Sequence, residues 1–211
     1  MKFNDREQQL LGLCIEEMEA RTCAEVVLVI RKSSGNYKDV SYLVGAGMAW
    51  FALLLVLSIP TEVPEMWIPL PLVFVFWSLS WLAHRTPLRA WLSTRKRKSL
   101  QVNRAAHACF YEKKIHETSS HSGILLYCSS LEKQARIVMD RNAAAALETK
   151  RISEFEAQLT EACGSQDRFK ALSETLRTLG LYLGAKLPSL PTPLAHELAN
   201  LPELDQPDEE N

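Results

Sequence analysis

A small set of ionisable and hydroxyl side chains lies at the ends of three apolar segments, and these residues could bind a cation or a phosphate. The set consists of Thr22, Glu25, His121, Asp140 and Arg141. Carboxylates and hydroxyls supply the oxygen ligands that Ca²⁺ and Mg²⁺ take, and an arginine beside them could hold a phosphate. We single out Asp140 and Glu25 as candidate metal ligands and the remaining three as further candidates.

The same residues have an ordinary structural interpretation, which we favour. Thr22 can cap a turn, and Asp140 can cap a following helix or pair with Arg141. A cap of this kind contributes about 1 kcal/mol. Two or three oxygen ligands also leave a cation site incomplete unless loop carbonyls fill it. We therefore assign no cofactor and no catalytic residue, and calcium binding stays an alternative.

Motifs of nucleophilic catalysis are missing from the sequence, which contains no G-x-S-x-G, Walker loop or H-E-x-x-H. Ser129 and Ser130 follow an apolar segment, but the sequence forces no histidine or acid close to them. The five cysteines form no C-x-x-C pair, which fits a reducing compartment better than a disulfide framework or zinc ribbon. Cys128 lies within an apolar segment, where burial raises a thiol pKa and disfavours a reactive thiolate.

Three short segments are predicted to form the sheet that positions the candidate residues. Residues 24–30 and 123–129 are apolar runs with polar boundaries, and residues 134–140 follow after only four residues. So short a link makes the last two strands antiparallel, whereas the long crossover makes the first two parallel. In this arrangement Gly123 lies opposite Asp140, and all five candidates share one end of the sheet.

Apolar residues at helical spacing predict helices on either side of this sheet. The predicted helices cover residues 4–20, 100–117, 152–163 and 166–186. The fold class is therefore α/β, with a small central mixed sheet between helices, interrupted by a two-helix transmembrane hairpin.

The transmembrane hairpin is predicted from two runs without charge, residues 40–61 and 66–83. A membrane-spanning helix needs about 20 apolar residues. Burial of the two helices in a soluble core is the alternative, but a chain of 211 residues has little polar structure to cover them. Basic residues flank both runs, and the 60–65 turn carries none. The positive-inside rule therefore predicts a two-pass protein of the inner (plasma) membrane with both termini in the cytoplasm. The charged N-terminus predicts no cleaved leader.

Five regions follow from these assignments. The basic segment, residues 84–99, either lies along the inner leaflet or only fixes the orientation of the hairpin. The net charge of −1 gives no reason to expect nucleic acid as a partner. The regions are an N-terminal helix and first strand (1–39), the hairpin (40–83), a basic juxtamembrane segment (84–99), the remainder of the domain (100–187) and an acidic, proline-rich tail predicted to be disordered (188–211).

Several short motifs together resemble the TPM domain family over roughly residues 8–188. They are Thr22 with Ala24–Glu25, Tyr37–Asp39, Thr118 with Gly123, Asp140–Arg141 and Leu187–Pro188. The resemblance implies a compact, commonly membrane-attached domain with a sheet between helices. Some members look like accessory proteins of membrane complexes, and phosphatase activity and calcium binding are associated with others. This sequence departs from most members in lacking a leader and the acidic N-terminal segment, and its hairpin insertion is similar to one bacterial subgroup.

The resulting hypothesis is a membrane-anchored, TPM-like, non-catalytic accessory protein at the cytoplasmic face. Its expected partners are membrane lipid and a membrane protein. The alternatives are a membrane-bound phosphatase, implied by the resemblance alone, and a lipid- or cation-responsive regulator that uses the basic segment and the acidic end of the sheet.

Overall fold

The computed structural model describes residues 3–58, 69–86, 92–118, 121–188 and 203–204. The chain divides into two compact units. The first comprises Met1–Ser34 and Ser99–Asn211, and the second comprises Gly35–Lys98. Each unit is described separately below.

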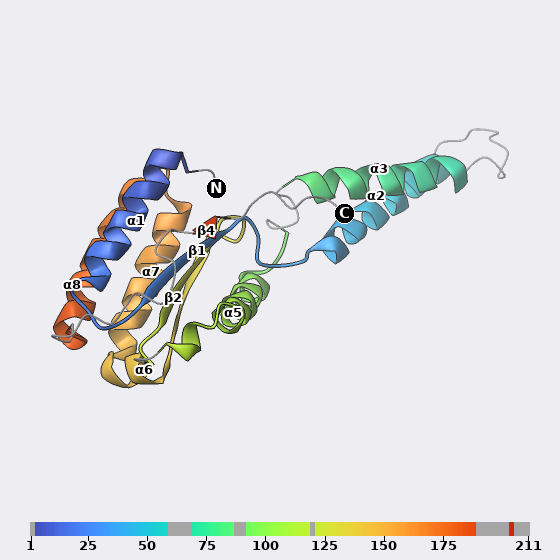
Figure 1. The fold of residues 1–211 in the computed structure, drawn as a ribbon. Helices are drawn as coiled ribbons and strands as arrows, with labels where there is room; N and C mark the ends of the chain where they lie inside the picture. The colour runs from blue at the N-terminus through green and yellow to red at the C-terminus, as the bar shows by residue number, and fades with distance from the viewer. Residues whose placement is uncertain (1–2, 59–68, 87–91, 119–120, 189–202, 205–211) are drawn as a thin grey trace. The chain divides into compact units, whose positions relative to one another are not determined.

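The first unit is built on a mixed sheet with the strand order β3-β2-β1-β4 (Figure 1). Its three six-residue strands are β1 (Val26–Arg31), β2 (Ile124–Ser129) and β3 (Gln134–Met139). β1 pairs with β2 in parallel and β2 pairs with β3 antiparallel, which confirms the predicted directions. The predicted α/β fold with a small mixed sheet is therefore correct.

A fourth strand, β4 (Glu203–Leu204), adds to the free edge of β1 in parallel. It lies inside the 188–211 tail, for which the sequence predicts disorder and no strand. The other tail residues from 189 onward lie outside the described residues, as does the turn of helix anticipated at 194–199.

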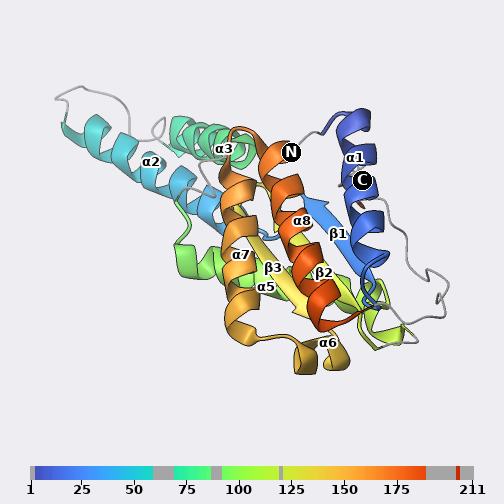
Figure 2. The ribbon, with the colours of Figure 1, turned by 90° about the vertical axis from the view of Figure 1, so that its left-hand side faces the viewer.

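Helices cover both faces of the sheet, as Figures 1 and 2 show. α1 (Asp5–Glu19), α7 (Thr149–Gly164) and α8 (Arg168–Lys186) pack on one face, where the larger core contains Leu28, Leu126 and Leu176. α5 (Arg95–Glu112) packs on the other, where Val29 and Leu125 meet Val102. Successive strand residues point to opposite faces, so the continuous apolar strands supply both cores.

The helix boundaries differ from the predictions where local hydrogen bonds decide them. α5 begins at Arg95 rather than at residue 100, because the Thr94 hydroxyl accepts from the Arg97 N–H at 3.3 Å and caps the helix. The basic cluster predicted as part of a separate juxtamembrane segment is therefore the first turn of α5. The left-handed Lys114 (φ 55°) separates α5 from the short 3-10 helix η2 (Ile115–Glu117). A further short helix, α6 (Arg141–Ala146), follows β3.

The second unit contains α2 (Lys38–Ser58) and α3 (Pro69–Arg85), which pack against each other. At Gly45 the two backbones approach so closely that an added Cβ would lie 2.8 Å from the Phe76 carbonyl oxygen. Small residues of this kind allow helices in membranes to pack closely. The predicted turn at 60–65 and Trp67 lie outside the described residues.

Among the residues that the structure describes, α2 alone is long and apolar enough to cross a membrane, judged by length and composition. α3 has 17 described helical residues. Length and composition thus support one membrane-crossing helix, α2, among the described residues.

Candidate functional site

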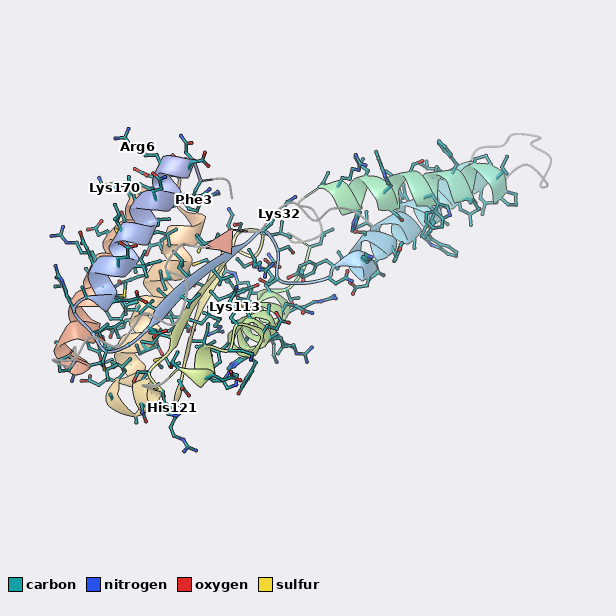
Figure 3. All side chains as sticks on the ribbon, in the orientation of Figure 1. Phe3, Arg6, Lys32, Lys113, His121 and Lys170 are labelled. Atoms are coloured by element: carbon teal, nitrogen blue, oxygen red, sulfur yellow. The ribbon has the colours of Figure 1, made fainter. Side chains whose placement is uncertain are left out.

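The sequence-predicted candidates lie at the amino end of β1 and β2. Val26 pairs with Ile124, and the Asp140 N–H donates to the Gly123 carbonyl at 2.9 Å. This is the predicted register, with Gly123 opposite Asp140. The His121 Nδ1 lies 3.5 Å from Asp140 Oδ2, and Figure 3 shows His121 at this end of the sheet. The structure therefore brings His121 and Asp140 together.

The contacts of Asp140 and Thr22 are those of structural caps. Asp140 Oδ1 accepts from the Arg141 N–H at 2.7 Å and caps α6. The Thr22 hydroxyl donates to the Leu187 carbonyl at 2.6 Å and accepts from the Ala24 N–H at 3.2 Å. Thr22 thus connects the end of α8 to the start of β1.

No metal-binding group emerges from these residues. Arg141 is exposed and Glu25 is half-buried. Within the described ranges, no three or more His, Cys, Asp or Glu side chains converge in a way that could hold a metal ion. The contacts support the capping interpretation of Thr22 and Asp140.

The opposite, carboxyl end of β1 and β2 contains a polar cluster that the sequence did not predict. Glu132, in the turn between β2 and β3, is only 4% exposed. Its carboxylate accepts from the Ser34 N–H at 3.1 Å, from the Ser33 hydroxyl at 3.4 Å and from the Ser129 hydroxyl. The sequence forced no acid close to Ser129, but the structure places the Glu132 carboxylate there. The available signal was the position of Glu132, three residues beyond Ser129 in a tight turn.

This serine–carboxylate pair serves as a structural link and has no access for a substrate. The Ser129 side chain is completely buried, and the Glu132 carboxylate joins the loop after β1 to the turn after β2. Next to it, the Tyr127 hydroxyl lies 3.0 Å from the Ser34 hydroxyl. Burial raises the pKa of the Tyr127 phenol, while the hydrogen bond to Ser34 acts in the opposite direction.

The buried thiols are not set up as nucleophiles. The Cys128 thiol donates a hydrogen bond to Cys163, and this bond together with burial raises the pKa of Cys128 well above its usual value. The same bond lowers the pKa of Cys163, which is also buried. The raised pKa of Cys128 agrees with the sequence prediction, but its main cause is a neighbour from α7 that the sequence could not indicate.

A groove of about 810 Å³ runs between α1 and α8 on the outer surface of the first unit. The helices run parallel, because Met18 lies against Gly180 and Arg21 lies against Gly184. Figure 3 shows Arg6 and Lys170 at the same end of this pair. Leu10, Leu13 and Leu181 line the groove and are exposed.

Charged residues of both signs surround this apolar surface, which is the form of a helix-binding groove. The charged lining residues are Glu17, Arg21, Lys170, Glu174 and Arg177. An exposed apolar strip with a polar rim is typical of a protein-interaction surface.

The comparisons with known proteins support the fold alone. No family model matches the chain, and no curated protein matches it. Among solved structures, the chain is similar to the BA42 protein from the psychrophilic bacterium Bizionia argentinensis. BA42 is a TPM-like domain protein whose structure was determined by NMR. The TM-score is 0.59 with 12% sequence identity, and the match covers 97% of each chain. The fold of this chain is therefore TPM-like.

Proposed function

We propose that this protein is a non-catalytic module, anchored by α2 and α3 in the inner membrane, whose α/β unit binds a membrane-protein partner at the cytoplasmic face. The observation that carries the proposal is the large apolar exposure of both helices. Leu43 is 70% exposed on α2 and Phe74 is 73% exposed on α3. An apolar surface of this extent is unfavourable in water and favourable in lipid.

The helix lengths support a bilayer as the solvent for this surface. The 21 residues of α2 extend about 31 Å, close to the roughly 30 Å hydrocarbon core of a bilayer. The 17 described residues of α3 reach the short end of the spanning range, with Pro69 and Pro71 in the first turn, where proline is tolerated.

The charge distribution supports a two-pass orientation with both termini in the cytoplasm. Lys38 precedes the apolar part of α2, and Arg85 ends α3. The two helices run antiparallel, because Tyr42 near the start of α2 and Trp81 near the end of α3 line the same pocket. Their basic ends therefore lie together, as the positive-inside rule requires of a cytoplasmic end.

The groove between α1 and α8 is the surface proposed for the partner. Leu10, Leu13 and Leu181 would receive the apolar face of an amphipathic helix, and the charges along the rim would select its orientation. The caps made by Thr22 and Asp140 and the burial of Ser129 account for the other conspicuous polar residues without assigning them a reaction.

Site-specific photocrosslinking in intact cells tests the partner surface. A photoreactive amino acid at Leu13 or Leu181 should give a discrete adduct with a membrane protein. The matched control is Tyr111, which is exposed on α5 over the other face of the sheet and should give none. The absence of adducts at both groove positions, or equal adducts at Tyr111, would remove the groove from the proposal.

Reporter fusions test the orientation separately. A reporter that is active only outside the cytoplasm should be silent at either terminus and active when inserted in the 60–65 turn. An active fusion at the N-terminus would contradict the two-pass orientation.

A further inference from the structure

We propose that the outer edge of β1 is a docking site for an extended acidic segment of a second protein. Such a segment adds to the sheet as a parallel strand and replaces β4, the chain's own C-terminal strand, which pairs with this edge in the structure (Figure 1). Strand addition of this kind uses the backbone groups of a sheet edge. The edge shares no residue with the groove between α1 and α8, so the inference goes beyond the proposed function.

The opposite edge of the sheet, formed by β3, is closed to an added strand. The Ala135 N–H donates to the Thr160 hydroxyl at 3.0 Å, and the Ile137 N–H donates to a Glu156 carboxylate oxygen at 3.0 Å. Both acceptors project from α7. Covering an edge with a helix is one of the ways in which proteins prevent strand addition. The edge of β1 is therefore the one to consider for a docking segment.

The backbone groups of β1 that face away from β2 belong to alternate residues. The Arg31 carbonyl accepts from the Ser130 N–H at 3.0 Å, on the side of β2. Because the backbone groups of successive residues alternate between the two sides of a strand, Leu28 and Ile30 direct theirs to the outer edge. These N–H and carbonyl groups are the ones that an added strand would bind.

A side chain closes the start of this edge, whereas backbone covers its carboxyl half. The Val26 N–H donates to Glu19 Oε1 at 2.9 Å. Further along, the edge pairs in parallel with Glu203–Leu204, and Ile30 lies opposite Leu204. β4 has two residues and β1 has six, so a longer segment can pair with more of the edge than β4 does.

The charge at the carboxyl end of β1 favours an acidic segment. An added strand in the register of β4 that continues past the position of Leu204 would pass Arg31 and Lys32. Lys32 is exposed, and Figure 3 marks its place. The chain's own segment has the matching composition, with no Lys or Arg after Lys186 and with acids at positions 203, 205, 208, 209 and 210. Complementary charge of this kind selects partners and fixes the register of docking.

β4 acts as a competitor for the docking segment. Because β4 belongs to the same chain, it competes at an effective concentration on the order of millimolar. A partner segment must exceed this through longer pairing with β1 or stronger attraction to the basic residues. The chain's own strand thus holds the edge until such a segment is present.

Peptide binding to the full-length protein in nonionic detergent tests the edge. The double variant Glu203→Pro/Leu204→Pro vacates it, because proline cannot donate to a strand ladder. The probe is a fluorescent synthetic peptide of residues 198–211, followed by anisotropy. It should bind the double variant at least about tenfold more tightly than the unchanged protein, which corresponds to a Kd of about 0.1 mM or below on the vacated edge. The same peptide with the two prolines should not bind.

Charge variants in the double-proline background locate the bound peptide. Lys32→Gln should weaken binding by up to about fivefold, the range for an exposed charge pair. The matched control is Lys170→Gln, which removes an exposed charge from the groove lining on α8 and should leave binding unchanged.

Hydrogen exchange locates the peptide independently of charge. The Ile30 amide should exchange faster in the double-proline variant than in the unchanged protein, and added peptide should slow it again. The Ile137 amide, bound by Glu156 on the other edge, should not respond. Far-UV circular dichroism verifies the fold, and Glu203→Pro alone provides the same test if two prolines disturb it.

Four results would overturn the docking site. They are no binding of the peptide to the double-proline variant, equal binding of the proline-containing peptide, exchange at Ile30 that neither the prolines nor the peptide changes, and a dimer of the unchanged protein that the prolines abolish. The dimer, measured by light scattering, would give the edge to a second copy of this chain. No membrane protein enters these assays, so their failure leaves the groove between α1 and α8 untouched, and photocrosslinking at Leu13 tests that groove alone.

Discussion

Removal of the Glu132 carboxylate should destabilise the α/β unit strongly, although Glu132 lies in a turn. Three donors, the Ser33 hydroxyl, the Ser34 N–H and the Ser129 hydroxyl, point to this buried group. A hydrogen bond to a charged acceptor contributes about 1.5–3 kcal/mol, so three of them give a gross loss of about 5–9 kcal/mol. The cost of burying the carboxylate, several kcal/mol, offsets part of this. We expect Glu132→Ala to lose about 2–4 kcal/mol net.

Thermal unfolding in nonionic detergent, followed by far-UV circular dichroism, measures this effect. For a unit of about 150 residues each kcal/mol shifts Tm by roughly 2–4 °C, so Tm should fall by about 5–15 °C. Tryptophan fluorescence would not report it, because all five tryptophans lie between residues 50 and 91. The Tm of Glu132→Gln should lie between those of Glu132→Ala and the unchanged protein, since the amide nitrogen of glutamine cannot accept a hydrogen bond from a hydroxyl.

The control for Glu132 is Glu154→Ala, which removes an exposed carboxylate paired with Arg151 at 2.8 Å on α7. Exposed pairs of this kind contribute about 0–1 kcal/mol. If Glu132→Ala has the same Tm as Glu154→Ala and the unchanged protein, the Glu132 carboxylate does not hold the two loops together and the reasoning is refuted.

Three other predictions concern the two ends of the sheet. Asp140→Ala should cost about 1 kcal/mol through loss of the α6 cap, and added Ca²⁺ should leave the Tm of the unchanged protein the same within error; a rise of several degrees would restore the metal-site alternative. Gly123→Ala should lower Tm clearly, because its Cβ would lie 2.3 Å from the Ile115 carbonyl oxygen, while Gly164→Ala, with open space around its Cβ, should be tolerated; similar melting of both variants would contradict this. Burial raises the pKa of Tyr127, so the folded state keeps the phenol proton to higher pH than the unfolded chain does. The stability should therefore fall as the pH rises above the ordinary tyrosine pKa of about 10. Tyr127→Phe should flatten that fall, and the same alkaline stability profile in the variant and the unchanged protein would contradict the prediction.

The sheet could be predicted because its determinants are local. Short apolar runs identified β1 and β2, and the four-residue link before residue 134 fixed both the antiparallel direction and the register that places Gly123 opposite Asp140. The parallel pairing of β1 with β2 followed from the length of the crossover between them.

The remaining features depend on contacts between residues that are distant in the sequence. β4 pairs with the edge of β1, more than 170 residues away in the sequence, and its two residues carry no strand pattern of their own. The hydrogen bond between Cys128 and Cys163 joins β2 to α7. The groove needs α1 and α8 side by side in parallel, and the amphipathic pattern of each helix alone cannot specify its neighbour.

The roles of the candidate residues depend on geometry that the sequence does not show. His121 and Asp140 do come together at the amino end of the sheet. The hydroxyl of Thr22, however, binds the Leu187 carbonyl, and Asp140 caps α6. Types of residue alone cannot distinguish a ligand from a cap, because both uses require the same oxygen atoms.

Alkaline carbonate washing of isolated membranes is the most direct measurement of the membrane anchor, on which the proposed function depends. With α2 and α3 surrounded by lipid, the protein should remain in the membrane pellet and leave it only when detergent is added. Its release into the carbonate supernatant would contradict the account, because helices with Leu43 and Phe74 exposed would then have to be covered by protein instead of lipid.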